Sequence, residues 1–271
     1  MMTLNASRAV SPTVLNGLVG AWCPSLGPSG YTLLDRSGRG NHGALTNMDA
    51  ASDWVGTPGG WALDFDGVND NVPTDIEATK VIPSGKPFSV SLWVYLSGAQ
   101  PSTAGGYLIS DFNAAGSDCS LSIRVFRDNS IDAFTNSQGH DLIRGGSITT
   151  DEWFHVVFVA RSEANKELYV DGVSVGTSTV SVTRATAGNL TFGQPGDLTS
   201  LNFRLNGRLA DLGMWNRALA APEVVALHRA SQGGLGRLLT QQRRRVYGIA
   251  ATAVKPYLFL NRGQVIGGGM L

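Results

Sequence analysis

Charged residues and cysteines are both scarce in this chain of 271 residues. Lysine, arginine, aspartate and glutamate make up 15% of the sequence, and 21 basic residues balance 21 acidic ones. A chain without net charge exerts little long-range attraction on nucleic acid or an anionic membrane, so we expect neither partner. The two cysteines, Cys23 and Cys119, are too few for a disulfide framework. We expect both to be small buried apolar side chains.

Long apolar runs are lacking as well. No stretch approaches the roughly 18 apolar residues that suggest a membrane-spanning helix. The segment MMTLNASRAVSPTVLNG, residues 1–17, has no apolar centre of the signal-peptide kind. We therefore expect no membrane segment, and we recognise no signal peptide.

What the chain does contain indicates strands and turns. Apolar and polar residues alternate repeatedly from Leu18 to about Leu205, and 34 glycines are present. In FSVSLWVYL, residues 88–96, one face is apolar and the other carries Trp93 and Tyr95. Asp171-Gly172, between two alternating runs, predicts a hairpin. Many short strands of similar spacing predict an all-β sandwich.

Two segments near the end of the sequence differ from this pattern. APEVVALHRA, Ala221–Ala230, predicts a helix with Pro222 in its first turn. Residues 231–271 then combine an arginine cluster with apolar runs that prolines and glycines interrupt. This apolar content argues against free disorder, so we predict an extended arm that packs on its own domain or on a neighbour.

Three segments together resemble a known family: DRSGRGNHGAL (35–45), WALDFDGVND (61–70) and GRLADLGMWNRALAAPEV (207–224). They are similar to the laminin G-like, or pentraxin-like, branch of the concanavalin A-like lectins and glucanases. The resemblance implies a jelly-roll β-sandwich over residues 15–230, with one short C-terminal helix. Segment 1–14 would precede this domain and the arm, 231–271, would follow it. Most members of this branch are binding modules.

Calcium is a common companion of this family, and the resemblance suggests where it would bind. Calcium requires six to eight oxygen ligands. Asp35, Asn41 and the carbonyl of Gly43 could supply part of a cage, and Asp211 resembles the acidic residue that closes it. In the alternative interpretation, Asp35 only caps its own turn and Asp211 pairs with an arginine.

Exposed aromatic rings beside polar groups would indicate a sugar site. Trp54 lies in a polar stretch and is the tryptophan that we predict to bind a ligand, with Asp66 and Asp70 of a second acidic cluster. That cluster could also hold a cation, and Asp66-Gly67 also fits a simple hairpin turn. The other aromatic candidates are Trp61, Trp93, Tyr95, Tyr107 and Trp215.

Catalytic patterns are not recognisable. A glycosidase needs two carboxylates about 5–10 Å apart across the sugar bond, and no predicted strand carries such a pair. There is no Gly-x-Ser-x-Gly nucleophile elbow and no pair of histidines with zinc-binding spacing. We therefore expect a non-catalytic protein.

Two functions remain open. The first is a calcium-dependent, lectin-like module that binds surface glycans. The second, which the apolar arm favours, is a decoration or fibre-type component of a large extracellular particle such as a phage virion. In that interpretation the arm joins copies of the chain, or other particle proteins. Its predicted assembly residues are Arg243, Arg244, Arg245, Tyr247, Tyr257 and Phe259. The arginines could equally form a solvated basic turn.

Overall fold

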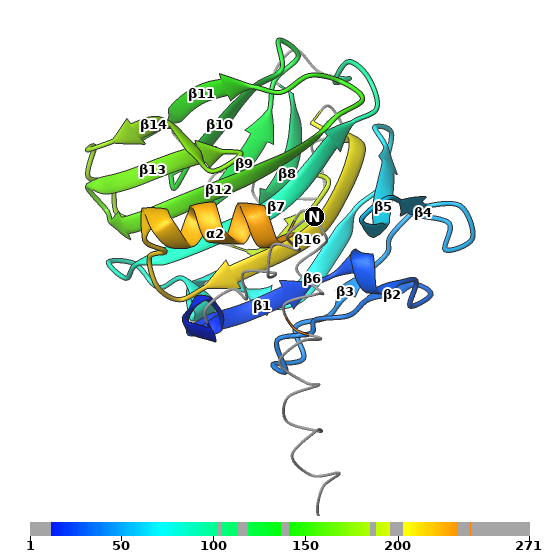
Figure 1. Cartoon of the computed structure of the whole chain (residues 1–271), viewed down its shortest axis with the longest axis horizontal. Helices are drawn as coiled ribbons and strands as arrows, with labels where there is room; N and C mark the ends of the chain where they lie inside the picture. The colour runs from blue at the N-terminus through cyan, green and yellow to red at the C-terminus, as the bar shows by residue number, and fades with distance from the viewer. Residues whose placement is uncertain are drawn as a thin grey trace, which may run out of the picture.

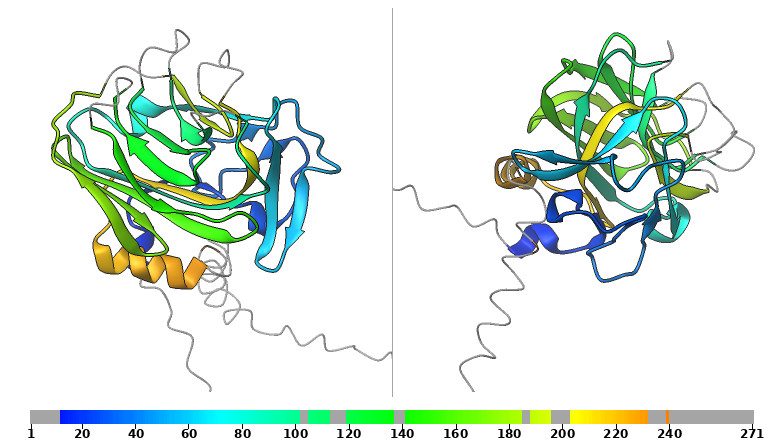
Figure 2. Two further views of the ribbon diagram at one scale, coloured as in Figure 1. Left: turned by 90° about the horizontal axis from the view of Figure 1, so that it is seen from above. Right: turned by 90° about the vertical axis from the view of Figure 1, so that its right-hand side faces the viewer.

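The protein is an all-β sandwich of two antiparallel sheets, as expected from the alternating pattern (Figure 1). The computed structural model describes residues 12–101, 105–112, 119–136, 141–184, 188–195, 203–231 and 239. Within these ranges each sheet has eight strands. Figure 2 shows the two sheets stacked as layers, with the longest helix of the described residues lying outside them. The predicted arm residues, from Arg243 to Phe259, lie outside the described ranges.

The first sheet holds the strands that build the candidate site. Its order is β14 (Val173–Ser178), β13 (Asn165–Val170), β12 (Trp153–Ser162), β7 (Phe88–Leu96), β16 (Asn206–Trp215), β5 (Gly60–Asp66) and β4 (Trp54–Thr57). A further strand, β1 (Leu18–Trp22), pairs with β16. The sheet therefore joins the beginning and the end of the domain through one pair of strands.

The second sheet covers the inner face of the first. Its order is β11 (Ile143–Ser147), β10 (Ser130–Phe134), β9 (Ser122–Val125), β8 (Gly106–Ser110), β15 (Asn189–Phe192), β6 (Val72–Glu77), β3 (Gly43–Ala44) and β2 (Thr32–Leu33). In the described ranges, the short helix η1 (Pro12–Leu15) precedes β1, and the short helices η2 (Pro24–Leu26) and α1 (Ala78–Val81) lie in connections between strands.

The main core lies between the sheets, and β7 shows why. Its alternate residues Phe88, Val90, Leu92, Val94 and Leu96 point inward and are at most 1% exposed. Because successive side chains of a strand point to opposite faces, the residues between them lie on the outer face of the first sheet. The sequence pattern of this strand thus separates core from surface directly.

A helix covers one half of that outer face. α2 (Ala221–Ser231) forms where the sequence predicts it and lies across the first sheet in Figure 1. Its residues Val224 and Leu227 pack in a second cluster with Val157 and Val159 of β12. Trp215, at the end of β16, completes this packing.

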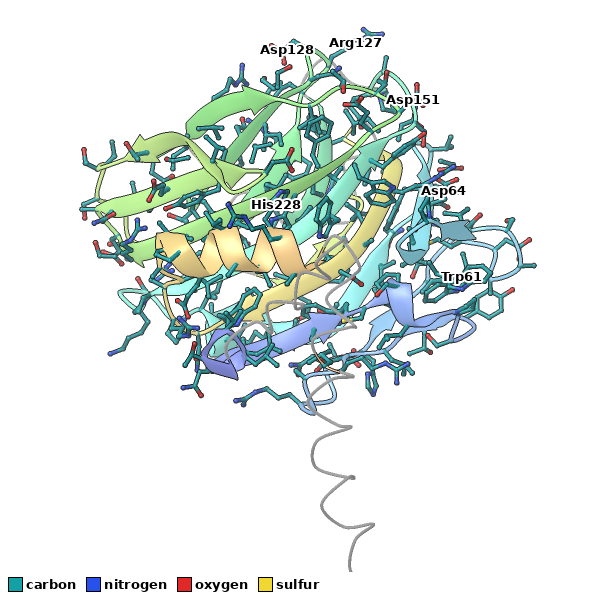
Figure 3. The ribbon with its side chains drawn as sticks, in the orientation of Figure 1. Trp61, Asp64, Arg127, Asp128, Asp151 and His228 are labelled. Carbon is teal, nitrogen blue, oxygen red and sulfur yellow. The ribbon has the colours of Figure 1, made fainter. Side chains whose placement is uncertain are left out.

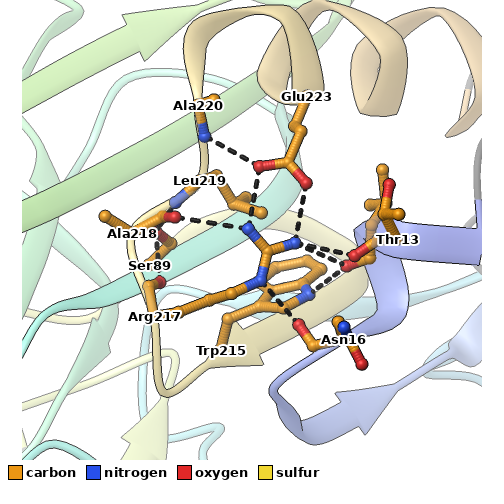
Figure 4. Close-up of polar contacts among 10 residues, drawn as sticks. Thr13, Asn16, Ser89, Trp215, Arg217, Ala218, Leu219, Ala220 and Glu223 are labelled. Atoms are coloured by element: carbon orange, nitrogen blue, oxygen red, sulfur yellow. Dashed lines mark hydrogen bonds and ion pairs between the residues drawn. The ribbon is translucent and has the colours of Figure 1, made fainter.

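Arg217 fastens the helix to the start of the described chain (Figure 4). Its guanidinium donates to both carboxylate oxygens of Glu223 at 2.8 Å, and also to the backbone oxygens of Thr13 and Asn16. Glu223 in turn accepts the N–H of Ala220, which satisfies a donor at the helix start in the manner of a capping box. One side chain therefore ties η1, β16 and α2 together.

Several smaller expectations can be compared with the structure. Cys23 and Cys119 are buried and free, as predicted. Asp171 and Gly172 have φ values of 50° and 79° and close the β13–β14 hairpin, as predicted. The hairpin interpretation of Asp66-Gly67 is corrected, because β5 and β6 belong to different sheets. Among the described residues, no helix is long and apolar enough to cross a membrane.

Candidate functional site

A pocket of about 400 Å³ opens on the outer face of the first sheet, beside the end of α2. Three tryptophans, two carboxylates and a histidine contribute to its wall. In Figure 3, His228 and Trp61 are seen in this part of the molecule. The lining residues come from η2, the β4–β5 hairpin, β7, β12, the β13–β14 turn, β16 and α2. They are Ser25, Thr57, Pro58, Gly59, Trp61, Trp93, Trp153, Asp171, Ala210, Asp211 and His228.

The outward side chains of β7 explain where the pocket begins. Ser89 and Ser91 lie opposite Val159 and Val157 of β12, which α2 covers. Trp93 comes next along the strand and lies opposite His155, at the end of the covered area. The helix ends at this point, so the ring of Trp93 stays partly exposed and forms part of the pocket wall.

A β-bulge brings a carboxylate into the pocket. Ala210 of β16 pairs with Trp93, but the next pairing joins Gly213 to Ser91, so β16 carries one extra residue. Asp211 lies in this bulge, with a φ of 46°, and lines the pocket although it is only 2% exposed. Bulges redirect side chains beside functional sites. The left-handed backbone of a non-glycine residue is a strained feature of the kind that clusters at such sites.

Two histidines and Trp93 form a stack at the pocket wall. The His228 ring lies 5.6 Å from the Trp93 ring at an interplanar angle of 22°, and the buried His155 ring lies 5.5 Å from His228. His155 shares a 2.7 Å hydrogen bond with Ser91. Its Nδ1 is buried without a hydrogen-bond partner in the described part of the chain. Burial, and then the charge of His228, lowers the pKa of His155 to about 3, so His155 is neutral near pH 7.

Asp171 connects this stack to the β13–β14 turn. Its Oδ1 accepts the backbone N–H of His155 at 2.8 Å and lies 3.8 Å from Nδ1 of His228. The side chain of Asp171 remains 40% exposed. Its carboxylate is therefore held in place and is still accessible to a ligand in the pocket.

Beyond the pocket, the next row of outward side chains runs across four strands. Tyr95 of β7 lies opposite Trp153 of β12 on one side and opposite Arg208 of β16 on the other. Arg208 lies opposite Asp64 of β5 and forms an ion pair with it at 3.2 Å. Tyr95 also donates from its hydroxyl to Asp151 at 3.0 Å. Figure 3 labels Asp64, at the β5 end of this row, and Asp151, the acceptor of the Tyr95 hydroxyl.

The predicted calcium residues are engaged in other contacts. The Asp35 carboxylate accepts the backbone N–H groups of Ala21, Ser37 and Asn41, and also the Ser37 hydroxyl, all within 2.8–3.0 Å. The Asn41 side chain donates to the carbonyl of Val19. This geometry fits the turn-capping alternative for Asp35 better than a cation cage.

Asp211 is also separated from that turn. Trp22 of β1 pairs with Leu212 on one side and bridges Asp35 on the other. Because neighbouring strands lie about 4.8 Å apart, the two acidic backbones are roughly 10 Å apart across β1. Gly43 lies within β3, tightly packed against Val72. In the described part of the chain, no three His, Cys, Asp or Glu side chains form a group that could hold a metal ion. Calcium binding stays a prediction.

The predicted ligand residues are dispersed, and Trp54 requires a correction. Trp54 is 5% exposed, belongs to the main core and donates its indole N–H to the carbonyl of Gly30. A buried ring offers no face to a sugar. Asp66 is exposed and accepts the N–H of Val68, while Asp70 is buried and accepts the N–H of Asp66. Burial raises the pKa of Asp70 to about 6. Neither carboxylate lines the pocket.

Part of the pocket lining could be predicted from the sequence. Trp61 and Trp93 were both among the aromatic candidates, and both line it. Trp153, Asp171 and His228 were missed as site residues. The bulge had a signal, since Leu209 and Leu212 are both core residues and their spacing of three departs from the period of a strand.

Solved structures with a similar fold include enzymes that act on glycans. A sialidase from Trypanosoma rangeli aligns with a TM-score of 0.62 at 16% identity, over 87% of this chain and 36% of its own. Domain 4 of an extracellular arabinanase from Geobacillus stearothermophilus, in complex with arabinotriose, aligns with a TM-score of 0.58 at 18% identity. That match covers 78% of this chain and 98% of the domain. At such identity the likeness establishes the fold alone.

These similarities correct one expectation. We expected a non-catalytic protein because no carboxylate pair is recognisable in the sequence. The fold is shared with chains of sialidases and of an arabinanase, so that exclusion does not stand. This chain spans about a third of the length of the sialidases, for example 36% of one of them, so the whole enzymes cannot be equated with it.

The family is identified by sequence similarity. A comparison with the curated proteins finds no match. The family model described as the concanavalin A-like lectin/glucanases superfamily matches residues 66–225, which is more than half of the chain. This range includes β7, β12 and β16, which carry Trp93, Trp153 and Asp211 of the pocket and most of the row beside it. The chain belongs to the concanavalin A-like lectin/glucanases superfamily, and its domain is of a carbohydrate-binding or glycan-related kind.

Proposed function

We propose that this domain binds a carbohydrate in the aromatic pocket beside α2. The observation that carries the proposal is the meeting of Trp61, Trp93 and Trp153 with Asp171 and Asp211 in one pocket of about 400 Å³. Aromatic rings bury the apolar C–H faces of a sugar, and carboxylates accept hydrogen bonds from its hydroxyl groups. A concave, largely apolar site with a few fixed polar groups is the usual form of a small-ligand site.

The charges around the pocket favour a neutral sugar. Asp171 and Asp211 line it, and Asp64 and Asp151 lie in the adjoining row. Arg208 is the cation of that row, and it is paired with Asp64. An anionic sugar would meet this acidic surplus and lose affinity. The arabinanase domain of similar fold was solved with arabinotriose, so arabinose oligomers are the first probes to test.

The test is a binding measurement on the full chain by titration calorimetry. Arabinotriose, xylotriose and cellotriose serve as neutral probes, and sialyllactose as the anionic one. We expect one neutral probe to bind and Trp93→Ala to weaken it about tenfold or more, equivalent to about 1.4 kcal/mol. Tyr31→Ala is the matched control, because Tyr31 is a 63% exposed aromatic residue outside the pocket lining.

Two results would contradict the proposal. If none of the probes binds the wild type, the proposal that this domain binds carbohydrate fails. If Trp93→Ala and Tyr31→Ala weaken binding equally, the binding site is not the pocket. Repeating the titration with calcium and then with a chelator tests the predicted calcium dependence at the same time. A change in affinity would support it.

The second candidate function is assembly into a larger particle. It rests on the sequence of residues 241–271, where apolar side chains follow the cluster Arg243–Arg245. In this proposal the protein is a decoration or fibre-type component of a particle such as a phage virion, and glycan binding is a second duty. Truncation after Gln232 would test it: we expect the truncated chain to form a smaller oligomer than the full chain, as measured by the number of subunits in solution. The same oligomeric state in both proteins would exclude the arm as an assembly element.

A further inference from the structure

The pocket does not end at its own wall, because Trp153 belongs to two surfaces. It lines the pocket, and its ring lies 5.5 Å from that of Tyr95 in the neighbouring row. Tyr95 follows Trp93 by two residues on the same face of β7. Two residues along a strand advance by roughly 7 Å, a step comparable to one sugar unit of a glycan chain. A second aromatic position therefore lies one sugar away from the first.

The side chains of this row hold one another in position. The Arg208 guanidinium lies 4.9 Å from the centroid of the Tyr95 ring and pairs with Asp64. The Tyr95 hydroxyl is fixed by Asp151. Each of these contacts limits the rotamers of a surface side chain before any ligand arrives. A preordered surface loses less conformational entropy on binding than a mobile one.

The row also offers the polar groups that a second sugar requires. Arg208 donates from Nε to Asp64, and its two terminal amino groups have no hydrogen-bond partner in the described part of the chain. A guanidinium can donate to hydroxyl oxygens and a carboxylate can accept from hydroxyl groups. The side chains of Arg208 and Asp64 are 30% and 34% exposed, so both groups remain accessible.

We infer that the ligand is an oligosaccharide that runs along β7 from the pocket to the row formed by Trp153, Tyr95, Arg208 and Asp64. One unit occupies the pocket against Trp93, and the next lies beside Tyr95, Arg208 and Asp64. This inference rests on the proposed function and goes beyond it by naming the ligand class, a neutral glycan chain of two or more units. A single sugar would occupy only the pocket and would leave the row unused.

The test compares each monosaccharide with its trimer on the full chain: arabinose with arabinotriose, xylose with xylotriose, and glucose with cellotriose. For the sugar that is recognised, we expect the trimer to bind about tenfold or more tightly than the monomer. Tyr95→Ala and Arg208→Met should each weaken the trimer about fivefold or more and leave the monomer nearly unchanged. Trp93→Ala should weaken both ligands, because its ring belongs to the pocket.

Arg127→Met is the matched control for Arg208→Met. Arg127 is exposed and lies away from Trp61 and His228 in Figure 3. Thermal melting of each variant checks that it is folded, and Arg208→Met supplies the answer if Tyr95→Ala proves unstable. If monomer and trimer bind equally, or if Arg208→Met acts no differently from Arg127→Met, the second position is excluded while the pocket stands. If no probe binds the wild type, the proposed function fails together with this inference.

Discussion

The outer face of the first sheet is divided into two halves of opposite character. In the covered half, α2 packs on Val157, Val159 and Trp215, and all three are fully buried. In the open half, β7, which pairs with both β12 and β16, carries Trp93 and Tyr95, whose rings remain partly exposed. The covered rings and branched side chains form a second core under the helix. The open rings are covered only in part, by His228 on Trp93 and by Arg208 on Tyr95. Their contribution to folding is therefore smaller, and their exposed parts remain available to a ligand.

The largest expected effect separates the two halves by stability. Trp215 is fully buried, and its indole donates to the carbonyl of Val14 at 2.7 Å. Trp215→Ala should lower the free energy of unfolding by about 3–5 kcal/mol, since it opens a cavity and removes a buried hydrogen bond. Trp93→Ala should cost about 1 kcal/mol, because part of that ring already faces water. Urea denaturation of both variants measures the difference. Equal losses would mean that the halves do not differ in this way.

The next effect concerns pH at the boundary between the halves. His155 has a folded pKa of about 3, below its ordinary value of 6.5, because burial disfavours the imidazolium. Between these values the unfolded state binds more protons, so stability is lost as the pH falls below 6.5. This contribution amounts to about 2 kcal/mol between pH 6.5 and pH 5.

His155→Gln isolates that contribution, because glutamine can keep the hydrogen bond to Ser91. Burial raises the pKa of Asp111 to about 6, so Asp111 acts in the opposite direction and favours folding as the pH falls. The informative quantity is therefore the difference between wild type and variant at each pH, measured by urea denaturation. A difference that is constant from pH 7 to pH 5 would show that His155 does not remain neutral in the fold.

The two halves of the sheet show how much of the structure can be predicted from the sequence. The alternation in β7 predicts both of its faces, and the composition of residues 221–230 predicts the helix. The length of α2 relative to the strands decides which outward residues are covered, and no local pattern contains that information. Trp54 illustrates the same limit. Its surroundings in the sequence are polar, yet the loop at Gly30 supplies a hydrogen-bond acceptor and the sheet buries its ring.

The pocket was harder to predict because its parts are distant in the chain. Ser25, Trp93 and His228 meet only after three separate segments have packed. The bulge at Asp211 moves a carboxylate by one residue, and only the spacing of Leu209 and Leu212 indicates it. Motif searches look for catalytic or metal-binding groups at fixed spacing. A binding surface assembled from several strands has no such spacing.

A smaller effect is expected at the link between the covered half and the start of the domain. Arg217→Met removes the hydrogen bonds to Glu223, Thr13 and Asn16 but keeps an unbranched aliphatic chain. We expect a loss of about 1–2 kcal/mol in the free energy of unfolding, because bonds to charged groups are lost at a partly exposed site. Glu223→Gln should cost less, since glutamine can still accept the N–H of Ala220. A loss from Glu223→Gln as large as that from Arg217→Met would show that the backbone contacts contribute little.

The smallest effect is expected in the open half, at the ion pair of Arg208 and Asp64. Both side chains are about one third exposed, at 30% and 34%. Water and salt screen such a pair, so Asp64→Asn should change the free energy of unfolding by about 0.5 kcal/mol or less. Denaturation in low and in high salt measures it, and the change should shrink at high salt. The same variant should weaken the binding of a trisaccharide, because it releases Arg208 from its position over Tyr95. A large loss of stability without any loss of binding would contradict this prediction. It would show that the ion pair stabilises the fold and does not contribute to the ligand surface.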